Sequence, residues 1–133
     1  MMETFHLKSL ISAAKEDTDE GWQFIDAILA KEGAANQPEL LPWAKENGLH
    51  DTNGYVRDLA VSILEKSTLR IDEKTKNILL NHMQNDTNPY VQFRSAFTLF
   101  NKGIKTTKVI AKIREALTDP DVKEIAGGYL KEV

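Results

Sequence analysis

Two stretches of this chain are nearly identical. One begins at His50 and reads HDTNGYVRDLAVSIL, and the other begins at Asn85 and reads NDTNPYVQFRSAFTLF. Aspartate, threonine, asparagine, tyrosine and valine recur in the second copy 35 residues after the first. A repeat of roughly this period is typical of an array of helix pairs, in which each pair buries its apolar face against its neighbours.

Two weaker copies flank the strong ones. EDTDEGWQFIDAIL precedes them at an offset of 34 residues, and TDPDVKEIAGGYL follows them at an offset of 31. A chain of 133 residues suits one domain. The sequence therefore predicts a single domain, 1–133, with four repeats at approximately 2–31, 38–66, 72–102 and 106–132.

Each copy has the pattern of a helix start. Asn53, Asn88 and Asp119 are good N-caps, because their side-chain oxygens can accept from free N–H groups of the first turn. Pro89 and Pro120 then take the first helical position, where a missing N–H costs nothing.

The remaining segments also favour helices. Apolar residues return at helical spacing throughout, and no stretch alternates as a half-buried strand does. Gly33, Gly48 and Gly103 stand where helices should end. We predict an all-α fold, an α-solenoid of eight helices in four antiparallel pairs, whose first helices span Met2–Lys15, Pro38–Leu49, Asp72–Gln84 and Thr107–Leu117.

The repeat resembles that of the HEAT family, in the short HEAT-like form common in bacteria. That family places an aspartate in the turn between paired helices and an arginine just after the valine, as Asp51 and Arg57 do here. Asp86 fits the same pattern, but Gln92 replaces the arginine. The resemblance implies an α-solenoid that serves as a protein-binding scaffold, with the second helices lining a concave face.

Composition bears on the compartment of the protein and on the charge of its partners. The chain has no cysteine, which fits a reducing cytoplasm, and neither a signal peptide nor a membrane span is expected. Net charge is −6 over residues 1–66 and +3 over residues 67–133, which together give the total of −3. The acidic half could attract a cationic partner and the basic half an anionic one, or both could be solvated charge.

Little in the sequence points to chemistry. His6, His50 and His82 show no metal-ligand spacing, and Gly127-Gly128 lies in an expected helix, where close packing explains it better than phosphate binding. We therefore predict no enzyme, no metal and no cofactor. A basic cluster could form a weak phosphate-binding patch or a solvated helix face; it comprises Lys102, Lys105, Lys108, Lys112 and Arg114.

Aromatic residues suggest a binding surface. Tyr55 and Tyr90 share one repeat position, where they could anchor a partner or pack on the turn between helices. Phe93, Phe97 and Phe100 could line a groove or pack on the adjacent repeat. The candidate partner-binding residues are Trp22, Tyr55, Arg57, Asp58, Tyr90 and Phe93.

The leading functional hypothesis is a non-catalytic cytoplasmic module that binds another protein on its concave face. A bacterial immunity protein that neutralises a toxin is a second hypothesis, since residues 16–20, EDTDE, could cover a basic site. A bilin lyase-like or nucleic-acid-acting HEAT-like protein is a third. The partner's identity stays open, a homo-oligomer is possible, and nucleic acid and membrane are not expected partners.

Overall fold

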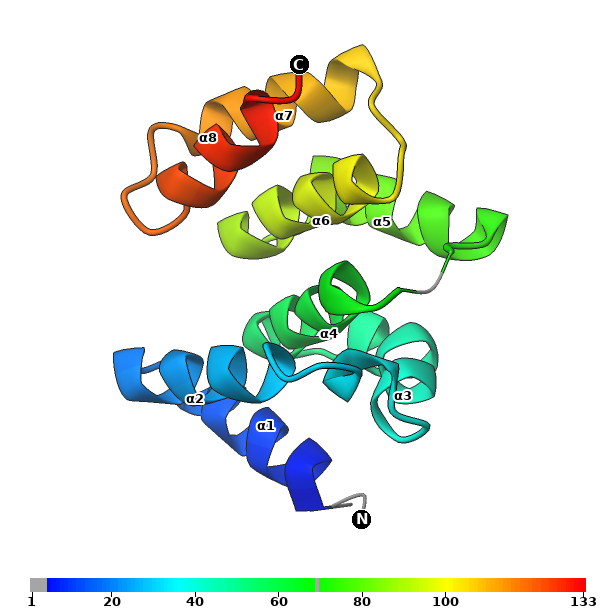
Figure 1. The fold of residues 1–133 in the computed structure, drawn as a ribbon, viewed down its shortest axis with the longest axis vertical. Coiled ribbons are helices and arrows are strands. Elements are labelled where there is room, and N and C mark those ends of the chain that lie inside the picture. The colour runs from blue at the N-terminus through cyan, green and yellow to red at the C-terminus, as the bar shows by residue number, and fades with distance from the viewer. Residues whose placement is uncertain (1–4, 69) are drawn as a thin grey trace. The chain divides into compact units, whose positions relative to one another are not determined.

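A computed structural model describes residues 5–68 and 70–133 of the chain, with side chains from Leu7 onward (Figure 1). Over these residues the chain forms α-helices and two short 3-10 helices and no strand, which confirms the all-α prediction. The predicted helix start at Met2 and the side chains of Phe5 and His6 lie outside the described part. The helices are α1 (Phe5–Glu16), α2 (Asp19–Leu29), η1 (Ala34–Asn36), α3 (Leu40–Glu46), η2 (Gly48–His50), α4 (Gly54–Lys66), α5 (Glu73–Asn85), α6 (Pro89–Asn101), α7 (Thr107–Ala116) and α8 (Lys123–Leu130).

The helices form two compact units, Met1–Leu69 and Arg70–Val133, and each unit holds two of the predicted repeats. In the first unit, α1 packs on α2, α3 packs on α4, and α1 also packs on α4. In the second unit, α5 packs on α6, α7 packs on α8, and α6 contacts both α7 and α8. Each unit is therefore two helix pairs joined by their own core, while a solenoid through all four repeats stays a prediction.

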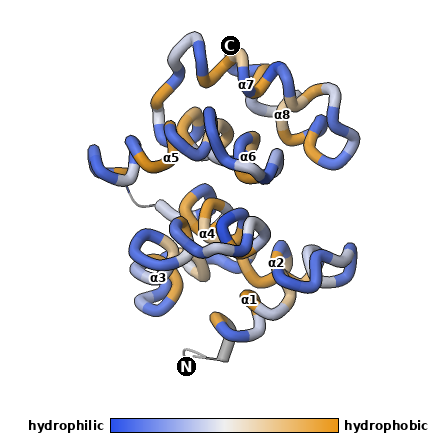
Figure 2. The backbone as a smooth tube through the Cα atoms, turned by 180° about the vertical axis from the view of Figure 1, so that it is seen from behind, coloured by the Kyte–Doolittle hydropathy of each residue, from blue (hydrophilic) through white to orange (hydrophobic). Residues whose placement is uncertain are grey.

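The second helix of each strong repeat is the most buried. Val56, Leu59 and Ile63 of α4 have no exposed surface, and neither have Val91 and Leu99 of α6. Burying a side chain of this size stabilises the fold by about 1.5–3 kcal/mol relative to leaving it exposed. Every labelled helix carries both hydrophobic and hydrophilic residues (Figure 2), as expected of helices that pack on one side. No helix in the described residues is long and apolar enough to cross a bilayer.

The two asparagine caps are confirmed. Asn53 Oδ1 accepts hydrogen bonds from the backbone N–H groups of Tyr55 at 2.8 Å and Val56 at 3.2 Å. Asn88 Oδ1 accepts from Tyr90 N–H at 2.8 Å. The copied sequence thus produces the same local structure twice.

The start of the last helix differs from the prediction. Asp119 was expected to cap a helix that begins at Pro120, but α8 begins at Lys123. The reason is that Asp119 Oδ1 accepts from the N–H of Asp121 at 2.9 Å, which folds the segment into a turn. The Asp119 carbonyl, rather than its side chain, accepts from Lys123 N–H at 2.9 Å.

Gly48 differs from the two glycines of α8 in the space around it. Gly48 follows α3, and a Cβ there would lie 2.6 Å from Ala60 Cβ and 2.8 Å from the Trp43 ring, so only glycine fits. Gly127 and Gly128 lie in α8, but a Cβ at either would meet nothing within 4 Å. The prediction that close packing requires these two glycines is therefore wrong, because that face of α8 is open.

Candidate partner-binding site

Asp17 joins two of the candidate residues in the first unit. Its carboxylate Oδ1 accepts a hydrogen bond from Trp22 Nε1 at 2.8 Å, and the Tyr55 hydroxyl hydrogen-bonds the same side chain. Trp22 comes from α2 and Tyr55 from the first turn of α4, so the carboxylate links two helices from different repeats. The aromatic rings of both residues are half-buried, which leaves part of each ring open to a partner.

Asp17 occupies an unusual backbone position. Its φ is +52°, and it is the one residue other than glycine with a positive φ in the described part of the chain. Aspartate tolerates this left-handed conformation better than most residues. Here it ends α1, with its N–H donating to the carbonyls of Ala13 and Ala14 at 3.3 and 3.1 Å. The sharp end of α1 thereby turns the carboxylate toward the two aromatic rings.

The environment of Tyr55 changes its acidity. The negative charge of Asp17 raises the pKa of Tyr55 above its ordinary value, because a phenolate would face a carboxylate. The hydrogen bond to Asp17 and partial burial raise the pKa further. Tyr55 therefore remains a neutral hydrogen-bond donor to a higher pH than an unperturbed tyrosine would.

Tyr90 makes the corresponding contact in the second unit. Its hydroxyl donates to Asp121 Oδ2 at 2.6 Å, in the turn between α7 and α8. Both tyrosines thus bond an aspartate from the other helix pair of their own unit. Asp17 precedes Tyr55 in the chain, whereas Asp121 follows Tyr90. The hydroxyl groups are committed to the fold, and only the ring faces are available as anchors.

Arg57 is held by the turn that precedes its helix. Its Nη1 donates to the backbone carbonyls of Asp51 at 2.8 Å and Thr52 at 3.2 Å. In the next repeat, Gln92 Nε2 donates to the Asp86 carbonyl at 2.5 Å. The glutamine that replaces the expected arginine therefore makes the same bond, to the carbonyl six residues before it. This gives Arg57 a structural role beside any contact with a partner.

Asp58 and Phe93 present little surface. Asp58 is only 3% exposed, the least of the buried acidic residues in α4. Phe93 is half-buried in α6, and the Lys112 ammonium lies 5.6 Å from its ring centroid. Lys112 also lies 3.3 Å from Glu115 Oε1. One lysine of the predicted basic cluster is thus already paired with an aromatic ring and a carboxylate.

The other two phenylalanines are buried. Phe97 has no exposed surface, and Phe100 is 2% exposed. Their ring centroids lie 5.5 and 5.6 Å from that of Tyr129 in α8, in a stacked and an edge-on arrangement. The sequence allowed two alternatives for these phenylalanines, lining a groove or packing on the adjacent repeat, and the second is correct for Phe97 and Phe100. They tie α6 to α8 and do not line a groove.

The two histidines whose side chains the structure describes lie at the ends of α5 and η2. His82 Nδ1 lies 3.2 Å from Asp86 Oδ2, where α5 ends. His50 is exposed at the end of η2. In the described part of the chain no three histidine, aspartate or glutamate side chains lie together as a metal site would require.

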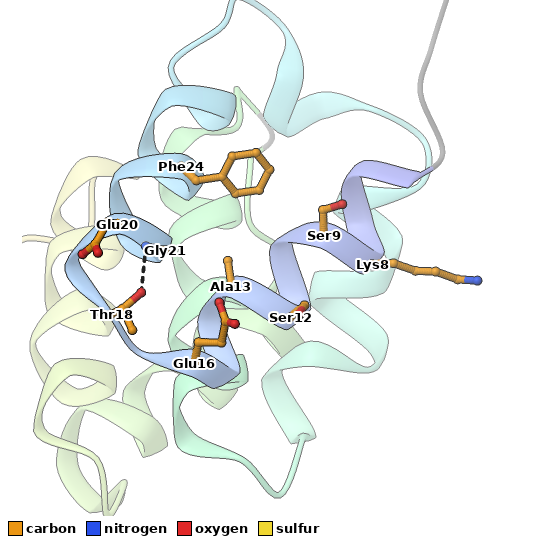
Figure 3. A pocket seen from close by; sticks show the side chains of 9 residues that line it. All are labelled: Lys8, Ser9, Ser12, Ala13, Glu16, Thr18, Glu20, Gly21 and Phe24. Carbon is orange, nitrogen blue, oxygen red and sulfur yellow. Dashed lines mark hydrogen bonds between the residues drawn. The ribbon is translucent and has the colours of Figure 1, made fainter.

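A hollow between α1 and α2 is a further surface feature, which the sequence did not indicate (Figure 3). Its volume is about 540 Å³, and Phe24, at 40% exposure, forms part of its wall. Helical spacing alone does not distinguish the exposed Phe24 from the buried apolar residues around it.

The six candidates therefore fall into two groups. Trp22, Tyr55, Arg57 and Asp58 lie in the first unit, and Tyr90 and Phe93 lie in the second. Trp22 and Tyr55 are brought together through Asp17, which the sequence indicated only within a weak repeat copy and the acidic segment 16–20. Family models, curated proteins and solved structures contain no match to this chain.

Proposed function

We propose that this chain is a non-catalytic module that binds another protein on a face built from its HEAT-like helix pairs. The observation that carries the proposal is the pair of half-buried aromatic rings, Trp22 and Tyr55, fixed by one carboxylate. Aromatic residues held in place before binding make good anchors, because little side-chain entropy is lost when a partner covers them.

The chemistry around these rings fits binding better than catalysis. The Asp17 carboxylate is used to orient Trp22 and Tyr55, and His82 is engaged with Asp86.

The charge beside the rings favours a cationic partner. All five residues of the segment 16–20 are exposed, and four of them are carboxylates. A basic protein would be steered toward this edge of the first unit at low salt. This observation supports the second candidate function, in which the chain is an immunity protein that covers the basic site of a toxin.

The test is affinity capture from a lysate of the source cells, with the tagged chain at low and at high salt. The proposal predicts one dominant protein, which is then purified and shown to bind directly. Capture should fall for Trp22→Ala and remain for Gln23→Ala, an exposed neighbour on the same helix. Retention of nucleic acid or of a pigment in place of a protein would overturn the proposal.

A further inference from the structure

The hollow between α1 and α2 has an ordered distribution of charge. α1 contributes Lys8 at one end and Glu16 at the other, with small side chains between them, and α2 contributes Glu20 and Phe24 (Figure 3). Figure 3 shows the Lys8 side chain extending away from α2, while Phe24 stands over the hollow. The lining residues are Lys8, Ser9, Ser12, Ala13, Glu16, Thr18, Glu20, Gly21 and Phe24.

Three of these residues form a line along one face of α1. Lys8, Ser12 and Glu16 are spaced four residues apart, so they follow one another on the same side of the helix. At a rise of about 1.5 Å per residue, Lys8 and Glu16 each lie about 6 Å along the axis from Ser12. The charges are therefore opposite in sign and placed evenly about a small residue.

These charges have no partner within the described part of the chain. No ion pair or hydrogen bond there engages Lys8, Glu16 or Glu20, and all three are exposed. Among the residues whose side chains the structure describes, Phe24 is one of four large apolar residues with substantial exposure. The hollow thus combines one exposed apolar ring with unpaired charges of both signs.

We propose that this hollow pairs with the same hollow of a second copy of the chain. A two-fold axis near Ser12 runs the two α1 helices antiparallel, and it brings Lys8 of each copy to Glu16 and Glu20 of the other. Such an interface is isologous, so each favourable pair occurs twice. The small side chains of Ser9, Ser12 and Ala13 let the helices approach closely, and Phe24 of each copy covers the apolar part.

A second copy fits this charge order better than a partner of one sign. A wholly basic segment would be repelled at Lys8, and a wholly acidic one at Glu16 and Glu20. When a second hollow is turned end for end, its Lys8 faces the Glu16 end of the first, so the charges of the hollow are complementary to themselves. Neither Trp22 nor Tyr55 lines the hollow, so loss of the pairing and loss of the aromatic anchors are distinguishable, although Glu16 and Glu20 belong both to the hollow and to the acidic segment 16–20.

Sedimentation velocity of the full chain, at concentrations up to about 1 mM, tests the pairing, because the fraction of a reversible dimer rises with concentration. The wild-type chain should form dimers reversibly. Lys8→Glu should weaken the dimer at least about tenfold, and Glu16→Lys with Glu20→Lys should do the same, because each places like charges opposite one another.

A mixture of the two variants decides the geometry. Combined in equal amounts, Lys8→Glu and the double variant Glu16→Lys/Glu20→Lys should form a mixed dimer, since every opposed pair is again opposite in sign. Glu46→Lys with Glu124→Lys is the matched control, because both residues are exposed and neither lines the hollow. Circular dichroism should show that all variants keep the wild-type helix content.

Three results would overturn the proposal. The first is a wild-type chain that stays monomeric over the whole range. The second is a dimer that the control pair weakens as much as the hollow variants do, which would place the contact elsewhere. The third is a mixture that stays monomeric although each single variant is folded, which would exclude the two-fold arrangement.

Discussion

The indole of Trp22 donates to the carboxylate of Asp17 at 2.8 Å, across five residues of chain that contain the end of α1 and the start of α2. This bond fixes an aromatic ring at a turn, which is where repeat proteins are otherwise most variable. The same carboxylate also interacts with the hydroxyl group of Tyr55, which belongs to the next repeat. A single acidic side chain thus sets the position of two rings in the first unit.

Asp17→Ala should destabilise the first unit. The variant loses two hydrogen bonds to a charged acceptor and places alanine at a φ of +52°. The left-handed backbone alone should cost alanine about 1 kcal/mol in the free energy of unfolding, read from urea denaturation, whereas the solvent-exposed contacts add little. Asp17→Asn keeps an acceptor oxygen and a residue that tolerates this φ, so it should lose clearly less. Equal losses in both variants would mean that the carboxylate does not hold the rings.

Tyr55 should ionise later than an unperturbed tyrosine as pH is raised. Because Asp17 raises the pKa of Tyr55 in the folded state, the unfolded chain releases this proton first. Stability from this contact is therefore complete below the ordinary tyrosine pKa and is lost as pH rises through the folded value. The phenolate absorbance is titrated in the wild type and in Tyr55→Phe, and the difference between the two curves gives the titration of Tyr55 alone. An ordinary titration midpoint in that difference would contradict the contact.

The glycines of α8 and of η2 should respond in opposite directions to alanine. Gly127→Ala and Gly128→Ala should each stabilise the chain by about 0.5–1 kcal/mol, because the helix interior favours alanine and the added methyl meets nothing. Gly48→Ala should destabilise it, since the methyl would lie 2.6 Å from Ala60 Cβ. Thermal unfolding of the three variants distinguishes an open face of α8 from a packed one, which would reverse the sign of the first two.

Arg57 and Gln92 should be partly interchangeable. Both donate to a carbonyl six residues earlier, so Arg57→Gln should retain most of the stability that Arg57→Ala loses, about 1 kcal/mol. Chemical denaturation of the two variants gives the comparison. If Arg57→Gln were as unstable as Arg57→Ala, the bond to Asp51 would depend on features of arginine that glutamine lacks.

The sequence was most informative where one residue decides the local structure. Asn53 and Asn88 were predicted as caps because an amide oxygen next to a helix start has few other uses, and both caps are present. Asp119 has the same signal but a competing use, since the N–H of Asp121 lies within its reach. A one-dimensional pattern does not say which of two nearby donors an aspartate will take.

Contacts between repeats were harder to foresee than structure within them. Asp17 was visible as part of the acidic segment 16–20, but its contact with Tyr55 spans 38 positions, and Tyr90 bonds Asp121 in the opposite chain direction. The Phe97 and Phe100 packing on Tyr129 also depends on how α6 and α8 meet. Helical periodicity identifies a face of a helix but does not identify the helix that covers it.

Calorimetric titration of the captured protein partner with wild-type chain and with Trp22→Ala tests the protein-binding proposal most directly. If the Trp22 ring anchors the partner, removing it should weaken the dissociation constant at least about tenfold, as is usual for a central aromatic residue. Gln23→Ala should leave it unchanged, and both variants must unfold as cooperatively as the wild type. An unchanged dissociation constant for folded Trp22→Ala would show that the partner binds elsewhere.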